Sequence, residues 1–243
     1  MATLAPPSVA NCVDPGAANW VRDHWSQIKD VSEARRVRYT TPPRVLIAVT
    51  GSVAAMKLPE LIQELVRTCK IPRSHVAVVT TKHAQHFFTA DDPRLASETD
   101  PIRVWTDEDE WQSWNQRGDS VVHIDLAKWA DVLLVAPLDA NTLAKWSQGL
   151  CDNLVSSVMR AWEVGDKPAI AAPAMNTRMW SHPLTAKQLA VLTHDLKVKI
   201  VVPVVKTLVC GDTGVGAMAH QPQIIDALLS ELLGVTVNLS TTM

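Results

Sequence analysis

The most regular part of the chain begins at Arg44, where an apolar run is followed by a turn and an amphipathic segment. Val45–Val49 is apolar at every position and rich in β-branched residues, which is typical of a strand buried on both faces of a parallel sheet. After the turn, apolar residues recur at a helical spacing, at Leu58, Leu61, Ile62, Leu65, Val66 and Cys69. Val76–Val79 is a second apolar run. The pattern predicts a strand–helix–strand unit, the opening of a doubly wound fold.

The same alternation continues toward the C-terminus. Further buried strands are predicted at Val132–Ala136, Ala169–Ala172 and Ile200–Val202. Further helices are predicted over residues 153–162, 186–196 and 224–232. The polar, Trp-rich segment Asp107–Asp119 is predicted to leave the sheet. We therefore expect an α/β fold with a doubly wound, mainly parallel sheet and helices on both faces, a three-layer architecture of the Rossmann or flavodoxin type.

The ends of the chain differ in composition from this central part. Residues 1–43 are punctuated by prolines and end in a basic run, so we expect a flexible N-terminal extension there. Residues 44–234 are predicted to form one folded domain, and residues 235–243 a C-terminal tail.

Composition narrows the class of protein. The chain has 243 residues, 47% of them hydrophobic, and a formal net charge of −2, which gives no sign of a nucleic-acid-binding patch. No signal-peptide pattern is present, and no apolar run reaches the roughly 18 residues that a membrane span needs, so a cytoplasmic protein is expected. The four cysteines, Cys12, Cys69, Cys151 and Cys210, have no zinc spacing and suit a reducing compartment. No metal site is predicted.

Ligands of such sheets bind at the carboxyl ends of the strands, which directs attention to four loops. They span residues 50–56, 80–86, 136–142 and 173–180 and are rich in small or hydrogen-bonding residues. In the first loop, Gly51, the Ser52 hydroxyl and the N–H groups of the next helix could hold a phosphate. The loop is neither a G-x-G-x-x-G fingerprint nor a Walker loop, and a plain turn with a Ser52 cap explains it equally well.

Three other positions are candidates for chemistry. His123 stands alone, and a lone histidine is more often structural than catalytic. Asn176 ends a predicted strand, where it could bind a ligand or cap a turn. Cys210 lies at the base of the glycine-rich segment 211–216, which could form a mobile flap, and a flap cysteine is more exposed than a structural one. His83 and His86 lack a third ligand, so a metal site there is disfavoured.

Seven motifs in order give the sequence a more specific meaning. They are TGSVAA at 50–55, TDEDEWQSWN at 106–115, HIDLAKWAD at 123–131, APLDANTLAK at 136–145, GLCDNL at 149–154, PAMNTRMW at 173–180 and CGDTGVGAMA at 210–219. Together they resemble the homo-oligomeric flavin-containing cysteine decarboxylases, over about residues 44–220. The resemblance implies bound FMN, a homotrimer with active sites between subunits, and decarboxylation of phosphopantothenoylcysteine to 4′-phosphopantetheine in coenzyme A biosynthesis.

The resemblance also assigns roles to residues. It implies that His123, Asn176 and Cys210 are catalytic, and that substrate is bound by Asn176, Val209 and Met218. The implied contacts to FMN are Gly51, Ser52, Val53, Thr81, Lys82, His83, Ala140, Asn141, Thr142, Leu143 and Met175. In the implied reaction Cys210 is the flap acid, protonated at neutral pH because an ordinary thiol has a pKa of about 8.5.

The need for a flavin follows from the implied substrate. Its carboxylate has no β-carbonyl to accept the electrons left by CO2, and its acylated amine cannot form a Schiff base with pyridoxal phosphate. Oxidation of the thiol to a thioaldehyde by a flavin provides the electron sink, and the electrons return after protonation. No net redox change results.

Three residues depart from the family's pattern, and the sequence leaves alternative functions open. Lys128, Asp139 and Thr207 stand where the family commonly has Arg, Ser and a basic residue, which bears on recognition of the substrate phosphate. One alternative is a halotolerance-type regulatory subunit that inhibits a protein phosphatase, or a catalytic partner in a hetero-oligomer. Another is a flavin prenyltransferase or a peptide cysteine decarboxylase of the same fold.

Overall fold

A six-stranded parallel sheet forms the centre of the molecule in a computed structural model that describes residues 42–97, 100–207 and 213–233. The strands are β1 (Val45–Val49), β2 (Val76–Thr80), β3 (Val104–Trp105), β4 (Val132–Leu138), β5 (Ala169–Pro173) and β6 (Lys199–Ile200). Their order is β3-β2-β1-β4-β5-β6, and every pairing between neighbours is parallel. This is the Rossmann order, so the predicted fold class is confirmed.

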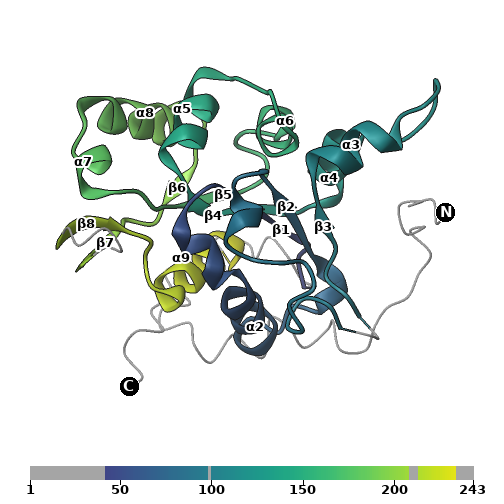
Figure 1. Ribbon diagram of the computed structural model, residues 1–243, viewed down its shortest axis with the longest axis horizontal. Helices are drawn as coiled ribbons and strands as arrows, with labels where there is room; N and C mark the ends of the chain where they lie inside the picture. Colours follow the sequence, from purple (N-terminus) through teal and green to yellow (C-terminus); the bar gives the residue numbers. More distant parts are fainter. Residues whose placement is uncertain (1–41, 98–99, 208–212, 234–243) are drawn as a thin grey trace.

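Helices cover both faces of the sheet, as Figure 1 shows. One face carries α2 (Leu58–Thr68) and α9 (Gln221–Leu233), and the other carries α4 (Val122–Trp129), α5 (Ala140–Gln148) and α6 (Leu154–Ala161). Side chains of β1 alternate between the two resulting cores. Val45, Ile47 and Val49 pack with α2 and α9, whereas Leu46 and Ala48 pack with the helices of the opposite face. Burial on both faces explains why the strands are apolar at successive positions.

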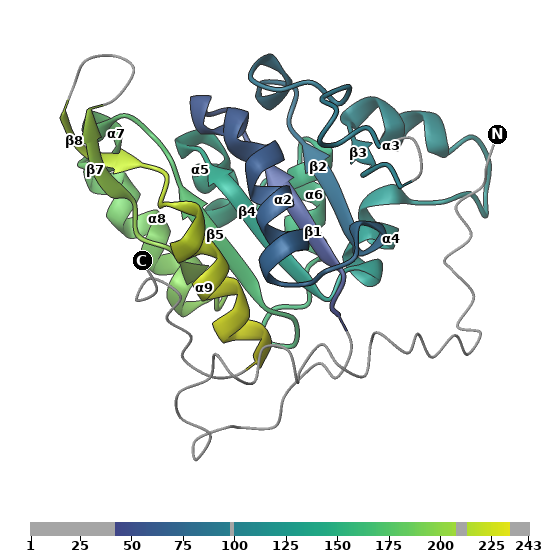
Figure 2. The ribbon, with the colours of Figure 1, turned by 90° about the horizontal axis from the view of Figure 1, so that it is seen from below.

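Shorter elements extend the two ends of the sheet. Three 3-10 turns, η2 (Val53–Lys57), η3 (Arg73–His75) and η4 (Ala84–His86), flank β1 and β2. At one end of the molecule α3 (Asp107–Ser113) precedes α4. At the other end lie α7 (Thr177–Trp180), α8 (Pro183–His194) and an antiparallel hairpin of β7 (Val204–Thr207) and β8 (Thr213–Ala217), and Figure 2 shows the same separation from below.

Most predicted elements are confirmed, one predicted strand needs a correction, and several observed elements were not predicted, among them helices α3, α4, α5 and α7 and strands β3, β7 and β8. The predicted strand Ile200–Val202 is wrong in its bounds: β6 ends at Ile200, and Val202 is 66% exposed just before Pro203. Proline has no N–H for a sheet ladder and restricts the residue before it, which favours an early end. Helices α4 and α5 were not among the predicted elements.

Some predictions concern residues for which the structure gives no description. These are the N-terminal extension, apart from residues 42 and 43, and the C-terminal tail. Among the described residues, no helix combines the length and apolar character that crossing a membrane requires.

Truncation of Leu134 tests the position of the core. Leu134 lies in the central strand β4 with none of its surface exposed, so Leu134→Ala is expected to lower the free energy of unfolding by about 2–5 kcal/mol. Leu184→Ala is the matched control, because Leu184 is 53% exposed and its loss should cost less than about 0.5 kcal/mol. Thermal unfolding of both variants at one protein concentration measures the difference. Equal melting temperatures would contradict the assignment of β4 to the core.

Candidate active site at the carboxyl edge of the sheet

The hydroxyl of Thr50 connects the ends of the two central strands. Thr50 follows β1 and is fully buried. Its Oγ1 donates to the carbonyl of Pro137 at 2.8 Å and accepts from the backbone N–H of Asp139 at 2.7 Å. Pro137 lies near the end of β4, and Asp139 is the N-cap of α5. The hydroxyl therefore forms a hydrogen bond with one backbone carbonyl and one backbone N–H between the end of β4 and the start of α5. These two bonds hold that segment against the loop after β1.

Gly51 is the point where three loops approach one another. A Cβ atom at this position would lie 2.9 Å from His83 Cβ, closer than real Cβ atoms come, and 3.0 Å from Asp139 Oδ2, which is tighter than most. His83 follows β2 and Asp139 follows β4, so the loops after β1, β2 and β4 meet here. Only glycine leaves the backbone of this turn uncovered in so small a space.

Capping groups shape the start of the two segments that follow. Ser52 is the N-cap of η2, and its hydroxyl accepts from Ala54 N at 3.4 Å. Asp139 is the N-cap of α5, and its Oδ1 accepts from Thr142 N at 2.7 Å. Each cap orients the backbone N–H groups at the start of its segment toward the carboxyl edge of the sheet.

The predicted FMN-contacting residues divide into exposed and buried groups. Val53, Lys82, His83 and Asn141 are exposed around Gly51, while Ser52 and Ala140 are partly buried. Thr81, Thr142, Leu143 and Met175 are buried, so their side chains pack inside the protein. All of them lie in the segments after β1, β2, β4 and β5. The sheet therefore brings the whole predicted set to one edge.

Asn176 occupies the same edge, beyond β5. Ala174 N donates to Leu138 O at 2.9 Å, which holds the segment after β5 against the end of β4. Asn176 is the N-cap of α7, and its Oδ1 accepts from Arg178 N at 2.8 Å. This bond fixes the side-chain rotamer. The capping alternative considered for Asn176 is thus realised.

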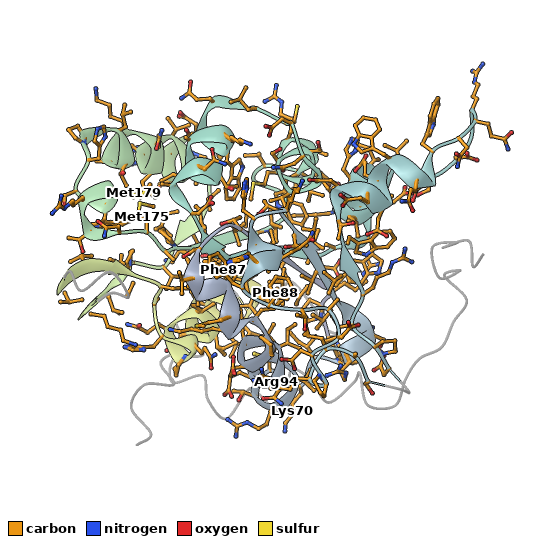
Figure 3. All side chains as sticks on the ribbon, viewed as in Figure 1. Lys70, Phe87, Phe88, Arg94, Met175 and Met179 are labelled. Carbon is orange, nitrogen blue, oxygen red and sulfur yellow. The ribbon has the colours of Figure 1, made fainter. Side chains whose placement is uncertain are left out.

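The β7–β8 hairpin packs directly on this segment. Met175 N donates to Gly216 O at 2.9 Å, and a Cβ at Gly216 would lie 2.3 Å from Met175 O. A Cβ at Gly214 would lie 2.6 Å from Thr177 Cγ2. Glycines at these positions let β8 contact the backbone beside Asn176. In Figure 3, Met175 and Met179 mark this end of the molecule, away from Phe87 and Phe88.

Two predicted residues of the flap, Cys210 and Val209, lie outside the described residues. Met218 follows β8 and is 3% exposed in the core cluster with α2 and α9, so its surroundings are those of a packing residue. Cys69 is also in that cluster, and burial raises the pKa of its thiol, which keeps it protonated and inert.

His123 is held in a different part of the chain. It lies in the first turn of α4, and its Nδ1 is 2.6 Å from Oε1 of Glu110 on α3. Figures 1 and 2 both place α3 and α4 at the opposite end of the molecule from α7 and the hairpin. Within one chain, His123 and Asn176 are therefore not brought together.

The structure also shows where the three residues that depart from the family pattern lie. Asp139 performs the helix capping that a serine would also perform. Lys128 lies near the end of α4 and is exposed, and Thr207 lies at the end of β7. Lys128 belongs to the His123 end of the molecule and Thr207 to the hairpin end.

Comparisons with known proteins agree with the fold class. A family model described as Flavoprotein matches residues 33–233. The chain is 50% identical over 192 residues to phosphopantothenoylcysteine decarboxylase of Mus musculus, an alignment that covers 77% of this chain and 88% of the mouse protein.

Solved structures with the same fold include two that are 45% identical to this chain. A cysteine-to-serine mutant of PPC decarboxylase in complex with pantothenoylaminoethenethiol has a TM-score of 0.69 and covers 76% of this chain and 96% of its own. The FMN binding protein AtHal3 has a TM-score of 0.67 and covers 77% and 95%. The chain belongs to the flavoprotein family, as the resemblance of its motifs implies.

Two residues that contact the candidate residues or their loops were not singled out from the sequence. In the sequence, Thr50 looked like part of a simple turn. No local sequence pattern predicts its hydrogen bonds to residues 137 and 139. Glu110 lies inside the quoted motif TDEDEWQSWN, and helical spacing would have placed it on α3 had the capping signal Thr106-x-x-Asp109 been used. Its pairing with His123 depends on how α3 meets α4.

Replacement of Thr50 tests how the loop after β4 is held. Thr50→Val keeps the shape but leaves Pro137 O and Asp139 N without their partner, so it should lower the free energy of unfolding by about 2–4 kcal/mol. Thr50→Ser keeps the hydroxyl and removes one methyl group, which should cost about 1 kcal/mol. Denaturant unfolding of the two variants measures this. A valine variant as stable as the serine variant would show that the two hydrogen bonds contribute little.

Proposed function

We propose that the protein is a carboxy-lyase that converts 4′-phosphopantothenoylcysteine to 4′-phosphopantetheine in coenzyme A biosynthesis, with FMN as cofactor. The observation that carries this proposal is the convergence of the loops after β1, β2 and β4 on Gly51, with Asn176 and the β7–β8 hairpin on the same edge. The 50% identity to the mouse decarboxylase supports the substrate.

The residues present fit FMN at this edge. Gly51 leaves a backbone cradle that a Cβ would fill, and the N-terminal N–H groups of η2 and α5 suit a phosphate group. Asn141 and His83 offer polar groups beside this cradle. Met175, in the segment after β5, is buried. Bound FMN supplies a reversible two-electron oxidation of the substrate thiol, which gives CO2 loss its electron sink.

Asn176 is proposed to bind the carboxylate end of the substrate. Because Oδ1 accepts from Arg178 N, the amide nitrogen is the group that can donate to a carboxylate. An amide is neutral, so it orients the carboxylate without the strong charge stabilisation that would oppose its loss as CO2.

His123 and Cys210 are proposed to handle protons. His123 accepts the thiol proton of the substrate or orients that thiol. Cys210 donates the proton that the substrate carbon needs after CO2 has left. Val209, beside it in the sequence, is proposed to contact substrate. The β7–β8 hairpin supports this proposal, because its strands flank residues 208–212 in the sequence and β8 packs on the segment that carries Asn176.

An oligomer, proposed here as a homotrimer, would complete the site between subunits. The placement of α4 and α7 at opposite ends of the chain supports this, since His123 of one copy can reach Asn176 only in another copy. Isologous or ring-forming contacts of a chain with itself are the usual way to bring such distant groups together.

A turnover assay tests the reaction. The purified protein with its flavin is given phosphopantothenoylcysteine, and 4′-phosphopantetheine is followed by mass spectrometry. The wild type should make product, whereas Cys210→Ser should stall with an oxidised, decarboxylated species, because a serine hydroxyl is a much weaker acid than a thiol. Cys151→Ser is the control, since Cys151 is exposed outside the site and its loss should leave turnover unchanged.

The assay tests the enzyme assignment and the role of Cys210 separately. Flavin-loaded wild type that makes no product would refute the enzyme assignment for the isolated chain and favour a regulatory role or a missing partner chain. A Cys210→Ser variant with full turnover would refute the role of that cysteine alone.

Subunit mixing tests whether the site lies between chains. His123→Gln and Asn176→Ala should each abolish most turnover when expressed alone. In a randomly mixed oligomer, about a quarter of the sites should combine a wild-type His123 with a wild-type Asn176, and turnover should return to about that fraction. Turnover that stays at the level of the single variants would place both residues in a site within one chain.

A further inference from the structure

Glu110, the hydrogen-bond partner of His123, has no part in the function as proposed so far. Oε1 of Glu110 lies 2.6 Å from Nδ1 of His123. The Glu110 side chain is 15% exposed and that of His123 is 28% exposed, so the pair is largely shielded from water. A carboxylate in such a place is costly unless it is paired and hydrogen-bonded.

Helix α3 holds Glu110 in a fixed position. A capping box closes its first turn, with Thr106 N donating to Asp109 Oδ2 at 2.8 Å and Asp109 N donating to Thr106 Oγ1 at 3.3 Å. The neighbouring Asp107 accepts from Leu154 N at 2.8 Å, which anchors α3 to the start of α6. Helix α4, which carries His123, packs with α6 in the same core. The distance between Glu110 and His123 is therefore set by rigid elements.

The chemistry of the two groups decides where the ring proton lies. An ionised carboxylate can only accept, so Nδ1 must carry the hydrogen of this bond. When the ring is neutral, Nε2 then has the lone pair. Among the described residues, Glu110 Oε2 is buried without a hydrogen-bond partner, and Nε2 has none either. The carboxylate thus directs its one bond at the histidine, and the histidine is left with one nitrogen that can accept a proton.

We propose that Glu110 is a positioning residue for the decarboxylation: it orients the His123 ring, selects the tautomer with hydrogen on Nδ1, and compensates the positive charge that His123 gains when Nε2 accepts a proton. The proposal rests on the proposed function, because it assumes that His123 acts on the substrate. It gives the motif TDEDEWQSWN a chemical role. It also requires that Glu110 and His123 come from the same subunit at each site.

Substitution of Glu110 by glutamine tests the proposal with a matched control. Glu110→Gln removes the charge and lets the amide either accept from Nδ1 or donate to it, which stabilises the wrong tautomer. We expect kcat to fall about 10–100-fold with KM within about threefold, because substrate binding is left intact. Glu108→Gln makes the same change on the same helix at an exposed side chain, and it should behave as wild type. Flavin content and oligomer mass of both variants should be unchanged.

A double-mutant cycle distinguishes positioning from a merely structural role. In a His123→Gln background, Glu110→Gln should cause no further loss of kcat, because it acts only through the histidine. A loss of equal size in both backgrounds, or full activity of the single Glu110→Gln variant, would overturn the proposal.

A spectroscopic measurement makes the result independent of turnover. In protein labelled with ¹⁵N-histidine, the ring nitrogens of His123 should report hydrogen on Nδ1 at high pH, and Glu110→Gln should populate the other tautomer. An unchanged tautomer in that variant would overturn the positioning role even if the assay succeeds. If the wild type makes no product but the tautomer shifts as expected, the proposed reaction fails while the control of His123 by Glu110 stands.

Discussion

The parallel pairing of β1 with β4 is the constraint on which the site depends. The chain runs from β1 outward through β2 to β3, then returns to β4 and continues outward in the other direction. Loops that follow β1 and β4 therefore leave in opposite senses and open a crevice at the carboxyl edge. The Thr50 hydroxyl closes the base of this crevice by hydrogen bonds to both sides of the β4–α5 turn. Gly51 has no side chain, which lets His83 and Asp139 approach its backbone closely.

A single chain can supply the proposed FMN-binding residues together, but it keeps the proposed catalytic residues Asn176 and His123 apart. All the residues proposed to hold FMN follow strands of one sheet, so a single chain supplies them together. Asn176 lies with the hairpin at one end of that edge, and His123 lies at the other end of the molecule on α4. In the proposed reaction, assembly is then a condition for catalysis and not only for stability. The subunit that contributes His123 also contributes Glu110, because α3 and α4 are adjacent in the chain.

Much of this could be predicted from the sequence, and the exceptions have identifiable causes. Strands such as Val45–Val49 and helices such as α2 were predicted because burial dictates their apolar patterns. Helix α4 was missed because Val121, Val122 and Ile124 are β-branched and favour a strand reading, while only Val122, Leu126 and Ala127 are buried. Helix α5 was missed although Asp139 and Gly149 are ordinary capping residues for its two ends. The pairing of Glu110 with His123 joins two helices, and no local pattern encodes how helices meet.

The distribution of charge in the proposed site follows the direction in which charge moves during the reaction. The substrate loses its carboxylate as CO2. A group that stabilised the negative charge of the carboxylate strongly in the ground state would slow this loss. Asn176 is neutral and avoids such stabilisation. The substrate thiol loses a proton, so the group that accepts it gains positive charge. Glu110 places a fixed carboxylate at 2.6 Å from the ring that gains this charge, on the side away from Nε2. In a largely buried place such compensation is stronger than in water, because the carboxylate needs no reorganisation when the proton arrives. In the proposed site, the departing carboxylate thus meets a neutral amide and not a cation, whereas the ring that becomes a cation meets a carboxylate.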